Sequence, residues 1–394
     1  MAKILFTWEL GGGMGHVAPY LPLARGLREK GHEVAFVLRD LSQAETSLGQ
    51  AGFPYFQAPI VLKGVGNQIH NPSTFAQILN NVGYSNVQLL TGLAKAWQQI
   101  FQSYQPDLII HDHSPTALIA SRNLDCRKIV IGSGFFIPPN VPTPPLLRTR
   151  PAPDMDVVAA DEARILANIN HVLVQLGSDP LDRIAQLYDV DSRIMTSYSE
   201  FDHYPGRPQG DVTYWGTLLS GLGSKPVWPA VQGKRIYAYL KPFQKMPALF
   251  QYLNKIQASV IVYAPELIKK DRLRLASESI HFSETPLDLI QAAAGCDIAI
   301  TNSTHGTVAT FLLAGKPVLL LPIYFEQAKL ARNIERMGAG LWSGLGNPQD
   351  MNNKLQMLLD DSRYRHAAEE FAKKYAGVAD DVEQKLIQHI DQLL

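Results

Sequence analysis

Residues 3–38 read KILFTWELGGGMGHVAPYLPLARGLREKGHEVAFVL, and this stretch decides the fold. It begins with an apolar run at 3–8 and continues through a glycine-rich loop at 11–15. Apolar residues then recur at helical spacing until Gly31, and a second apolar run follows at 32–38. A strand, a glycine loop, a helix and a second strand in this order predict the start of a parallel α/β sheet.

The same alternation continues through the first half of the chain. Apolar, β-branched runs at 106–112 and 127–133 predict further strands, and helical patterns lie around them at 86–103 and 114–124. Strands of this kind are typical of a parallel sheet that is covered by helices on both faces. Residues 138–153 contain seven prolines, a density that neither a helix nor a strand accommodates, so we expect a long loop there.

A break in the pattern divides the chain. Residues 203–233 hold four prolines and six glycines, which is typical of an interdomain linker. With 394 residues and roughly 150 residues per domain, we expect a domain at 1–214 and another at 215–394. Beyond the linker the rhythm resumes, with strands expected at 234–240, 258–264, 280–282, 297–303 and 316–323. The predicted fold is α/β, with two Rossmann-like domains facing across a cleft and a helical C-terminus that packs back.

The composition excludes several classes of protein. Lys and Arg total 36 against 36 Asp and Glu, so no net charge attracts a nucleic acid or an anionic membrane. Hydrophobic residues make up 46% of the chain, which is typical of a folded globular protein. The only cysteines, Cys126 and Cys296, fit a reducing compartment. With no signal peptide and no membrane-spanning run apparent, we expect a cytoplasmic protein.

The glycine loop itself is open to more than one interpretation. Gly13, Gly15 and Ala18 satisfy a GxGxxA pattern, and Asp40 at the end of the second predicted strand could accept a ribose, as in an NAD-dependent oxidoreductase. However, His16 places an imidazole where a dinucleotide fold brings bare backbone to the pyrophosphate. A third possibility is that the glycines only turn the chain and that the histidine caps a helix.

A second motif, TNSTHGT at 301–307, lies between a predicted strand and a predicted helix. Amides at a helix N-terminus attract phosphate, and four residues of the motif add hydroxyls or allow close approach, namely Ser303, Thr304, Gly306 and Thr307. The alternative is a Ser/Thr-rich helix cap without a ligand. Glu326 and Gln327, which follow the next predicted strand, favour a ligand site because polar groups at the carboxyl ends of parallel strands line binding crevices.

Taken together, GGGMGHVAPYLPLARGLREKGHEVAFV and THGTVATFLLAGKPVLLLPIYFEQAKLARNIERMGAG resemble the UDP-glycosyltransferase superfamily of GT-B fold. The resemblance is greatest to bacterial members that modify macrolides and flavonoids. It extends over nearly the whole chain, and VTYWGTLL at 212–219 is similar to the segment that opens the nucleotide-sugar domain in that family.

The resemblance implies a catalytic pair in the first domain. By position, His16 matches the family's general base and Asp112 matches the acid that holds it. Imidazole titrates in the range needed to take a proton from a hydroxyl, and a carboxylate fixes its tautomer. An alternative for Asp112 is that it caps the helix that follows. His111 and His113 flank the aspartate, and strand alternation is expected to point both away from it.

The resemblance also implies a donor site, made of Gly15, Thr217, Asn302, Ser303, Thr304, His305, Gly306, Thr307, Thr310, Glu326 and Gln327. Three positions depart from the family. Asn302 stands where a phosphate-binding histidine is usual, although His305 could replace it from the next turn. Thr310 stands where a glutamate usually holds the ribose, and Glu284 where an aromatic usually stacks on the base. dTDP is therefore expected to compete with UDP as the donor nucleotide.

We therefore expect an inverting, metal-independent glycosyltransferase without a cofactor, which moves a sugar from UDP or dTDP (for example dTDP-rhamnose) to a small apolar acceptor such as a flavonoid, macrolide or lipid. Two DxD triplets, at 154–156 and 189–191, do not follow convincing strands and are not expected to bind metal. Apolar surface for the acceptor is expected from Phe75, Tyr84, Phe135 and Phe136. The alternatives are an NAD-dependent oxidoreductase and a non-catalytic partner protein derived from the same fold.

Overall fold

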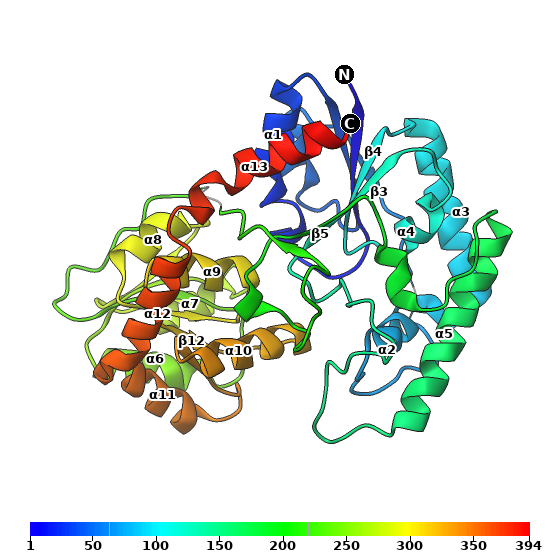
Figure 1. Cartoon of the computed structure of the whole chain (residues 1–394). Coiled ribbons are helices and arrows are strands. Elements are labelled where there is room, and N and C mark those ends of the chain that lie inside the picture. The colour runs from blue at the N-terminus through cyan, green and yellow to red at the C-terminus, as the bar shows by residue number, and fades with distance from the viewer. Residues whose placement is uncertain (63, 220, 222) are drawn as a thin grey trace. The chain divides into compact units, whose positions relative to one another are not determined.

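The computed structural model describes residues 1–62, 64–219, 221 and 223–394, which divide into two compact units (Figure 1). Unit 1 consists of Met1–Tyr198, His203–Gly216 and Asp381–Leu394, and unit 2 of Ser199–Asp202 and Thr217–Asp380. The chain passes from unit 1 to unit 2 between Gly216 and Thr217, within the proline- and glycine-rich segment, and returns to unit 1 at Asp381. Residues 381–394, which the sequence analysis grouped with the second domain, thus lie in unit 1.

In its described part, unit 1 contains a sheet of seven parallel strands in the spatial order β3 (Tyr55–Gln57), β2 (Glu33–Leu38), β1 (Lys3–Trp8), β4 (Leu108–Asp112), β5 (Arg127–Gly132), β6 (Ser192–Met195) and β7 (Thr213–Tyr214). β1 is central and pairs with β2 on one side and β4 on the other. The register brings Trp8 opposite Asp112. The carboxyl ends of β1 and β4, and the loops that follow them, are therefore neighbours.

Helices cover both faces of this sheet: α1 (Tyr20–Glu29), α2 (Phe75–Leu79), α3 (Val87–Tyr104), α4 (Pro115–Ser121), α5 (Met155–Gln175) and α13 (Val378–Leu393). Successive strand residues point to opposite faces. Leu5 packs into a buried cluster with Trp97 of α3, together with residues of α4 and α5. On the other face, Phe6 stacks with Phe36 at 4.8 Å and lies beside Tyr20 of α1. Short helical turns complete the unit, at Met14–His16, Glu45–Gly49, Asn80–Tyr84 and Ile184–Tyr188.

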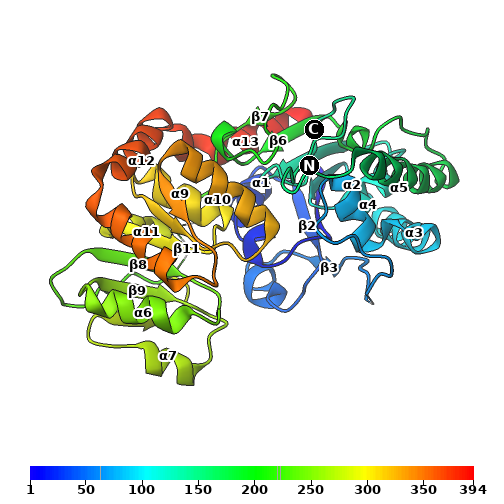
Figure 2. The ribbon, with the colours of Figure 1, turned by 90° about the horizontal axis from the view of Figure 1, so that it is seen from below.

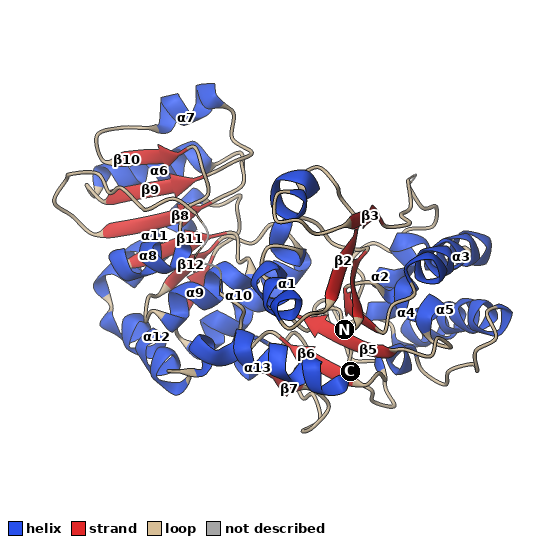
Figure 3. Cartoon of the chain, turned by 90° about the horizontal axis from the view of Figure 1, so that it is seen from above, coloured by secondary structure: helices blue, strands red, loops and turns tan. Residues whose placement is uncertain are grey.

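The C-terminal helix α13 lies beside α1 in unit 1 (Figures 1 and 3). Leu386 and Ile390 are fully buried on its inner face. Polar contacts hold the same end of the helix, since His32 Nε2 is 3.0 Å from Asp391 Oδ1 and His389 Nε2 is 2.9 Å from Ser192 Oγ. The terminal helix packs back, as expected, but it packs onto unit 1 and not onto the domain to which the sequence analysis assigned it.

Unit 2 repeats the architecture. Its described strands are parallel and follow the order β10 (Ile280–Ser283), β9 (Ser259–Tyr263), β8 (Arg235–Tyr239), β11 (Ile298–Thr301), β12 (Val318–Leu320) and β13 (Gly340–Trp342). Its helices are α6 (Met246–Lys255), α7 (Lys269–Leu275), α8 (Leu289–Gly295), α9 (His305–Leu313), α10 (Phe325–Met337), α11 (Pro348–Asp360) and α12 (Ser362–Lys374), with a short turn at Ser199–Phe201.

One buried cluster of unit 2 lies between its sheet and two of these helices. Ile236 and Val260 pack against Phe250 of α6 and Leu355 of α11, and α6 lies beside β8 and β9 (Figure 2). Because β8 and β11 are adjacent and parallel, their carboxyl ends open at the same edge of the sheet. The loops that begin α9 and α10 follow β11 and β12 at this edge. None of the helices in the described ranges combines the length and the apolarity that crossing a lipid bilayer would need.

Candidate active site

A histidine and an aspartate meet at the carboxyl edge of the sheet in unit 1. Asp112 is the last residue of β4, and His16 ends the short helical turn that follows the glycine loop. His16 Nδ1 is 2.8 Å from Asp112 Oδ2, and their side chains are 17% and 8% exposed. An ionised carboxylate only accepts hydrogen bonds, so Nδ1 carries the proton and the basic lone pair is on Nε2. This is the arrangement that a general base requires.

Two neighbours fix the imidazole of His16. Its ring stacks on the indole of Trp8, with the ring centres 5.0 Å apart and an interplanar angle of 15°. Gly11 adopts a φ of +83°, and a Cβ at this position would lie only 2.7 Å from His16 Nε2. Glycine is therefore needed at position 11 both for its backbone conformation and for the space beside the base.

His113 does not follow the strand alternation expected for it. The strand ends at Asp112, and His113 takes a left-handed conformation with a φ of +44°. Its ring lies 6.2 Å from the ring of His16 and stacks on Phe136. Burial, reinforced by His16, lowers the pKa of His113 well below its usual value, so the ring is neutral. The prediction that His113 faces away from the pair is wrong, because the backbone leaves the strand before this residue.

His111 lies within the strand, and its contacts are separate from the pair. Its Nδ1 is 3.0 Å from Thr7 Oγ1, and its Nε2 is 3.3 Å from Ser121 Oγ. Burial lowers the pKa of His111 to about 3, which makes this imidazole a neutral, hydrogen-bonded core group.

Glu9 is a buried carboxylate beside the pair that the sequence analysis did not single out. Its Oε1 accepts the backbone N–H of Thr116 at 2.8 Å, and its Oε2 accepts Trp97 Nε1–H at 2.8 Å. Burial raises the pKa of Glu9 to about 7. Glu9 thus binds the start of α4, whereas Asp112 makes no such bond, so the alternative role of Asp112 as a helix cap finds no support. The sequence signal that could have identified Glu9 is its position as a charged residue directly after the apolar strand β1.

In unit 2, the loop after β11 leads into the N-terminus of α9, which has no side-chain cap. Thr304 is the N-cap of α9 but makes no side-chain bond to the first amides, and its hydroxyl donates to Thr307 Oγ1 at 3.0 Å. Ser303 has a φ of +61°, and within the described part of the chain its buried hydroxyl makes no hydrogen bond. These uncapped amides and the buried hydroxyl suit an anionic ligand.

The two side chains nearest to this N-terminus are neutral. Asn302 binds backbone at both ends of its amide, since Oδ1 accepts Lys241 N–H at 2.6 Å and Nδ2 donates to Leu321 O at 2.7 Å. His305 is half-buried and lies 5.5 Å from the ring of Phe201. Burial lowers the pKa of His305 to about 4, so it carries no charge at neutral pH.

The remaining polar residues of this edge also bind backbone. Gln327 Oε1 accepts the N–H groups of Ile323 and Tyr324, at 2.9 and 3.2 Å, and so caps α10. Thr310 donates its hydroxyl to Gly306 O at 2.8 Å, one turn back in α9. Glu326 lies half-buried in the first turn of α10.

The chain is similar over nearly its full length to known glycosyltransferases. The curated "PGL/p-HBAD biosynthesis glycosyltransferase" of Mycobacterium tuberculosis is 23% identical over 412 residues, which cover 98% of this chain and 92% of that protein. The crystal structure of CalG4, the calicheamicin glycosyltransferase, matches with a TM-score of 0.74 and 17% identity, over 99% of this chain and 98% of that one. The spinosyn rhamnosyltransferase SpnG complexed with thymidine diphosphate matches with a TM-score of 0.67 and 18% identity, over 98% and 99%. No family model matches the chain.

The chain has the GT-B fold. The expected resemblance to GT-B glycosyltransferases and the predicted class of two parallel-sheet, Rossmann-like domains are confirmed by these comparisons. The enzyme class expected from the sequence, glycosyltransferase, is also the class of these relatives and structural neighbours.

The predicted acceptor aromatics divide into two groups within the GT-B chain. Phe75 and Tyr84 are 4% and 1% exposed and belong to the core of unit 1, where the hydroxyl of Tyr84 is 2.8 Å from Thr116 Oγ1. Phe136 is half-buried between His113 and Phe135, and its ring lies 6.5 Å from His16. Phe135, at 5% exposed, is also buried, so Phe136 is the most exposed of the four and lies near the base. Contact of all four with an acceptor stays a prediction.

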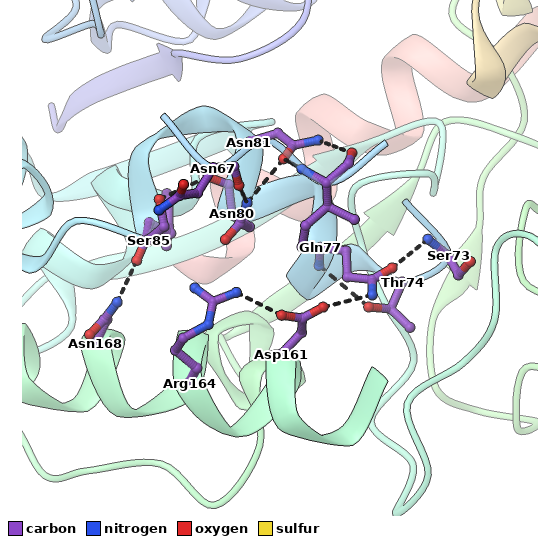
Figure 4. Close-up of polar contacts among 12 residues, drawn as sticks. Asn67, Ser73, Thr74, Gln77, Asn80, Asn81, Ser85, Asp161, Arg164 and Asn168 are labelled. Atoms are coloured by element: carbon purple, nitrogen blue, oxygen red, sulfur yellow. Dashed lines mark hydrogen bonds and ion pairs between the residues drawn. The ribbon is translucent and has the colours of Figure 1, made fainter. Parts of the chain in front are cut away.

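A polar network fixes the segment that carries Phe75 and Tyr84 (Figure 4). Asn81 binds both backbone groups of Ile69, accepting N–H at 2.7 Å and donating to O at 2.8 Å. Gln77 accepts the N–H of Ser73 at 2.7 Å and donates to Asp161 of α5 at 2.9 Å. Side chains of α2, α5 and the turn at 80–84 thereby hold the backbone of the loop at Ile69 and Ser73.

The other predicted residues have simpler surroundings. Gly15 is exposed in the turn before His16, and Thr217 is buried where unit 2 begins. One aspartate of each DxD triplet has a structural partner: Asp154 caps α5, and Asp191 pairs with Arg127 at 2.8 Å. Within the described ranges, no cluster of three or more His, Cys, Asp or Glu side chains is arranged to hold a metal ion.

Proposed function

We propose that the chain is an inverting glycosyltransferase that moves a sugar from a nucleoside diphosphate, UDP or dTDP, to a hydroxyl group of a small apolar natural product. The observation that carries this proposal is the His16–Asp112 pair at 2.8 Å, on a fold whose relatives are glycosyltransferases. Thymidine diphosphate in the SpnG complex supports a nucleotide-sugar donor.

The proposed reaction is a single displacement. His16 Nε2 would take the proton of the acceptor hydroxyl as its oxygen attacks the anomeric carbon, and the bond from that carbon to the diphosphate oxygen would break. Asp112 would stabilise the resulting imidazolium through Nδ1–H without itself taking the proton. The leaving diphosphate would be stabilised by the amides that begin α9. Attack opposite to the leaving group inverts the configuration at the anomeric carbon.

The first test removes the base. His16→Ala is expected to lower turnover by roughly 100- to 10,000-fold, because a positioned base contributes about that much. Binding of dTDP should persist, since the proposed phosphate site belongs to unit 2. Turnover is measured by product mass with UDP- and dTDP-sugars and a panel of phenolic and macrolide acceptors, and nucleotide binding is measured by calorimetry.

Two controls accompany this variant. Asp112→Asn keeps the size of the side chain but removes its charge, so it should lower turnover in the same direction without unfolding the protein. Full activity of either variant would show that the pair is not the base. Thermal protection by UDP, dTDP and NAD separates the proposal from its alternatives. Protection by NAD alone would favour an oxidoreductase, and protection by none would favour a non-catalytic protein.

We also propose that transfer needs no metal ion and no cofactor. Support comes from the uncapped α9 N-terminus, whose amides can take the negative charge that a divalent cation often neutralises. Turnover in excess EDTA should therefore equal turnover in buffer. Loss of activity that magnesium or manganese restores would contradict this part of the proposal. The expected cytoplasmic location remains a prediction, which cell fractionation tests.

A further inference from the structure

Lys241 stands directly beside the anion site of unit 2. It follows β8 by two residues, and its backbone N–H donates to Asn302 Oδ1 at 2.6 Å. Asn302 directly precedes Ser303 and the N-terminus of α9. The backbone of Lys241 therefore lies close to the uncapped amides. Neither the sequence motifs nor the resemblance singled out this residue.

The anion site needs a positive charge that its nearest side chains do not supply. A diphosphate carries more than one negative charge, whereas a helix N-terminus provides roughly half a positive charge. Asn302 is an amide, and the lowered pKa of His305, about 4, leaves that ring neutral at pH 7. Lys241 is a cation, because its hydrogen bond to Glu266 raises its pKa above the usual value.

The present partner of Lys241 can be exchanged. Lys241 Nζ is 2.7 Å from Glu266 Oε1, but the two side chains are 33% and 55% exposed. Exposed ion pairs contribute little to stability, since water solvates both charges and both side chains lose freedom. The ammonium also lies 5.8 Å from the ring centre of Tyr324, the N-cap of α10. It is therefore held near the helix that carries Glu326, a proposed contact of the donor sugar.

We propose that Lys241 leaves Glu266 and binds the diphosphate of the donor, together with the α9 amides. This inference rests on the proposed function and adds a binding residue to it. Glu266 acts as a counter-ion that holds the ammonium beside the site while no nucleotide is bound. The lysine supplies the charge that Asn302 does not, so the donor site depends on a residue from the loop after β8 in addition to the motif at 301–307.

The test compares ligands with and without phosphate. Calorimetry with dTDP and thymidine, and with UDP and uridine, is carried out on the wild type, Lys241→Gln and Lys241→Arg. Lys241→Gln should bind dTDP at least tenfold more weakly, the size expected for one charge-assisted hydrogen bond. Its affinity for thymidine should change by less than about twofold, and Lys241→Arg should restore most of the dTDP affinity. Lys245→Gln, an exposed lysine four residues away, is the matched control and should bind like the wild type.

Glu266→Gln, in contrast to Lys241→Gln, is not expected to weaken dTDP binding. If Glu266 competes with phosphate for the lysine, its neutral variant should bind dTDP as tightly as the wild type or several-fold tighter. Equal weakening by Glu266→Gln and Lys241→Gln would show a structural ion pair and would overturn the inference. So would a Lys241→Gln variant that binds dTDP within twofold of the wild type, a result that leaves the proposed function intact. A wild type that binds neither dTDP nor UDP would reject both.

Discussion

Several side chains of the proposed donor site form hydrogen bonds to nearby backbone, which leaves them fewer groups for a ligand. Asn302, Gln327 and Thr310 each spend part of their hydrogen-bonding capacity on nearby backbone. These bonds fix the loops at the edge of the sheet, so the proposed phosphate contacts are the backbone amides of α9 and the ammonium of Lys241. A site of this kind selects for negative charge more than for the exact shape of the nucleotide.

The weak selectivity for the nucleotide should be measurable as the ratio of the affinities for UDP and dTDP, which differ at the ribose 2′-position. Thr310 already donates its hydroxyl to Gly306 O and carries no charge, so dTDP should bind the wild type at least as well as UDP. Thr310→Glu would supply a charged acceptor for the 2′-hydroxyl, worth about 1.5 to 3 kcal/mol, and should shift the affinity ratio towards UDP by roughly ten- to a hundredfold. Calorimetric titration with both nucleotides measures this ratio.

Thr310→Val is the matched control, because it keeps the shape of the side chain and adds no acceptor. Its ratio should stay near that of the wild type. If the wild type binds UDP more than tenfold tighter than dTDP, another group holds the ribose and Thr310 is not the deciding residue.

At the scale of elements, strands with strong apolar patterns were predictable from sequence. The run at 3–8 is β1, and PDLIIHD contains β4 at Leu108–Asp112, with its carboxylate at the end where the pair forms. The position of His16 after the glycine loop was predictable for the same reason, since the loop must follow a strand and precede a helix. The contact between His16 and Asp112 came from the family resemblance and not from periodicity.

Other features depend on backbone detail or distant contacts. Helix α5 was not assigned, although Val158, Ile165, Ile169 and Val172 recur at helical spacing. His113 lies near the pair because its own backbone is left-handed, and no local sequence pattern predicts this conformation. The place of α13 in unit 1 depends on partners more than 150 residues away, such as Ser192 for His389. Sequence periodicity shows which face of a helix is buried but not against which element.

At the scale of the molecule, the proposed chemistry is divided between two bodies. Unit 1 carries the proposed catalytic pair, His16 and Asp112, and unit 2 carries the proposed anion site. Variants of the pair should therefore affect turnover, and variants of the anion site should affect nucleotide binding. Folding of unit 1 also buries the carboxyl group of Glu9, a few residues before His16 in the sequence. Burying this group in its ionised form costs free energy of folding. The stability of unit 1 should therefore depend on pH in a range that includes neutrality.

The sign of this dependence follows from the pKa of Glu9, which burial raises from 4.5 to about 7. The folded unit binds the proton more tightly than the unfolded chain does. The contribution of protonated Glu9 to the free energy of unfolding is complete below pH 4.5 and is lost as the pH rises through 7. At 1.36 kcal/mol per pKa unit, the loss between pH 5 and 8 is about 2 to 3 kcal/mol. Glu9→Gln retains an acceptor for Thr116 N–H but does not titrate, so it should remove this loss.

Hydrogen exchange of the α3 and α4 amides at pH 5 and pH 8, corrected for intrinsic rates, reports the opening of unit 1 without interference from unit 2. The wild type should lose more protection than Glu9→Gln between the two pH values, whereas Glu29→Gln, an exposed glutamate at the end of α1, should behave like the wild type. Equal losses in the wild type and Glu9→Gln would mean that the carboxyl group of Glu9 is ionised at both pH values. In that case, its bonds to Thr116 and Trp97 would outweigh the cost of burying the charge.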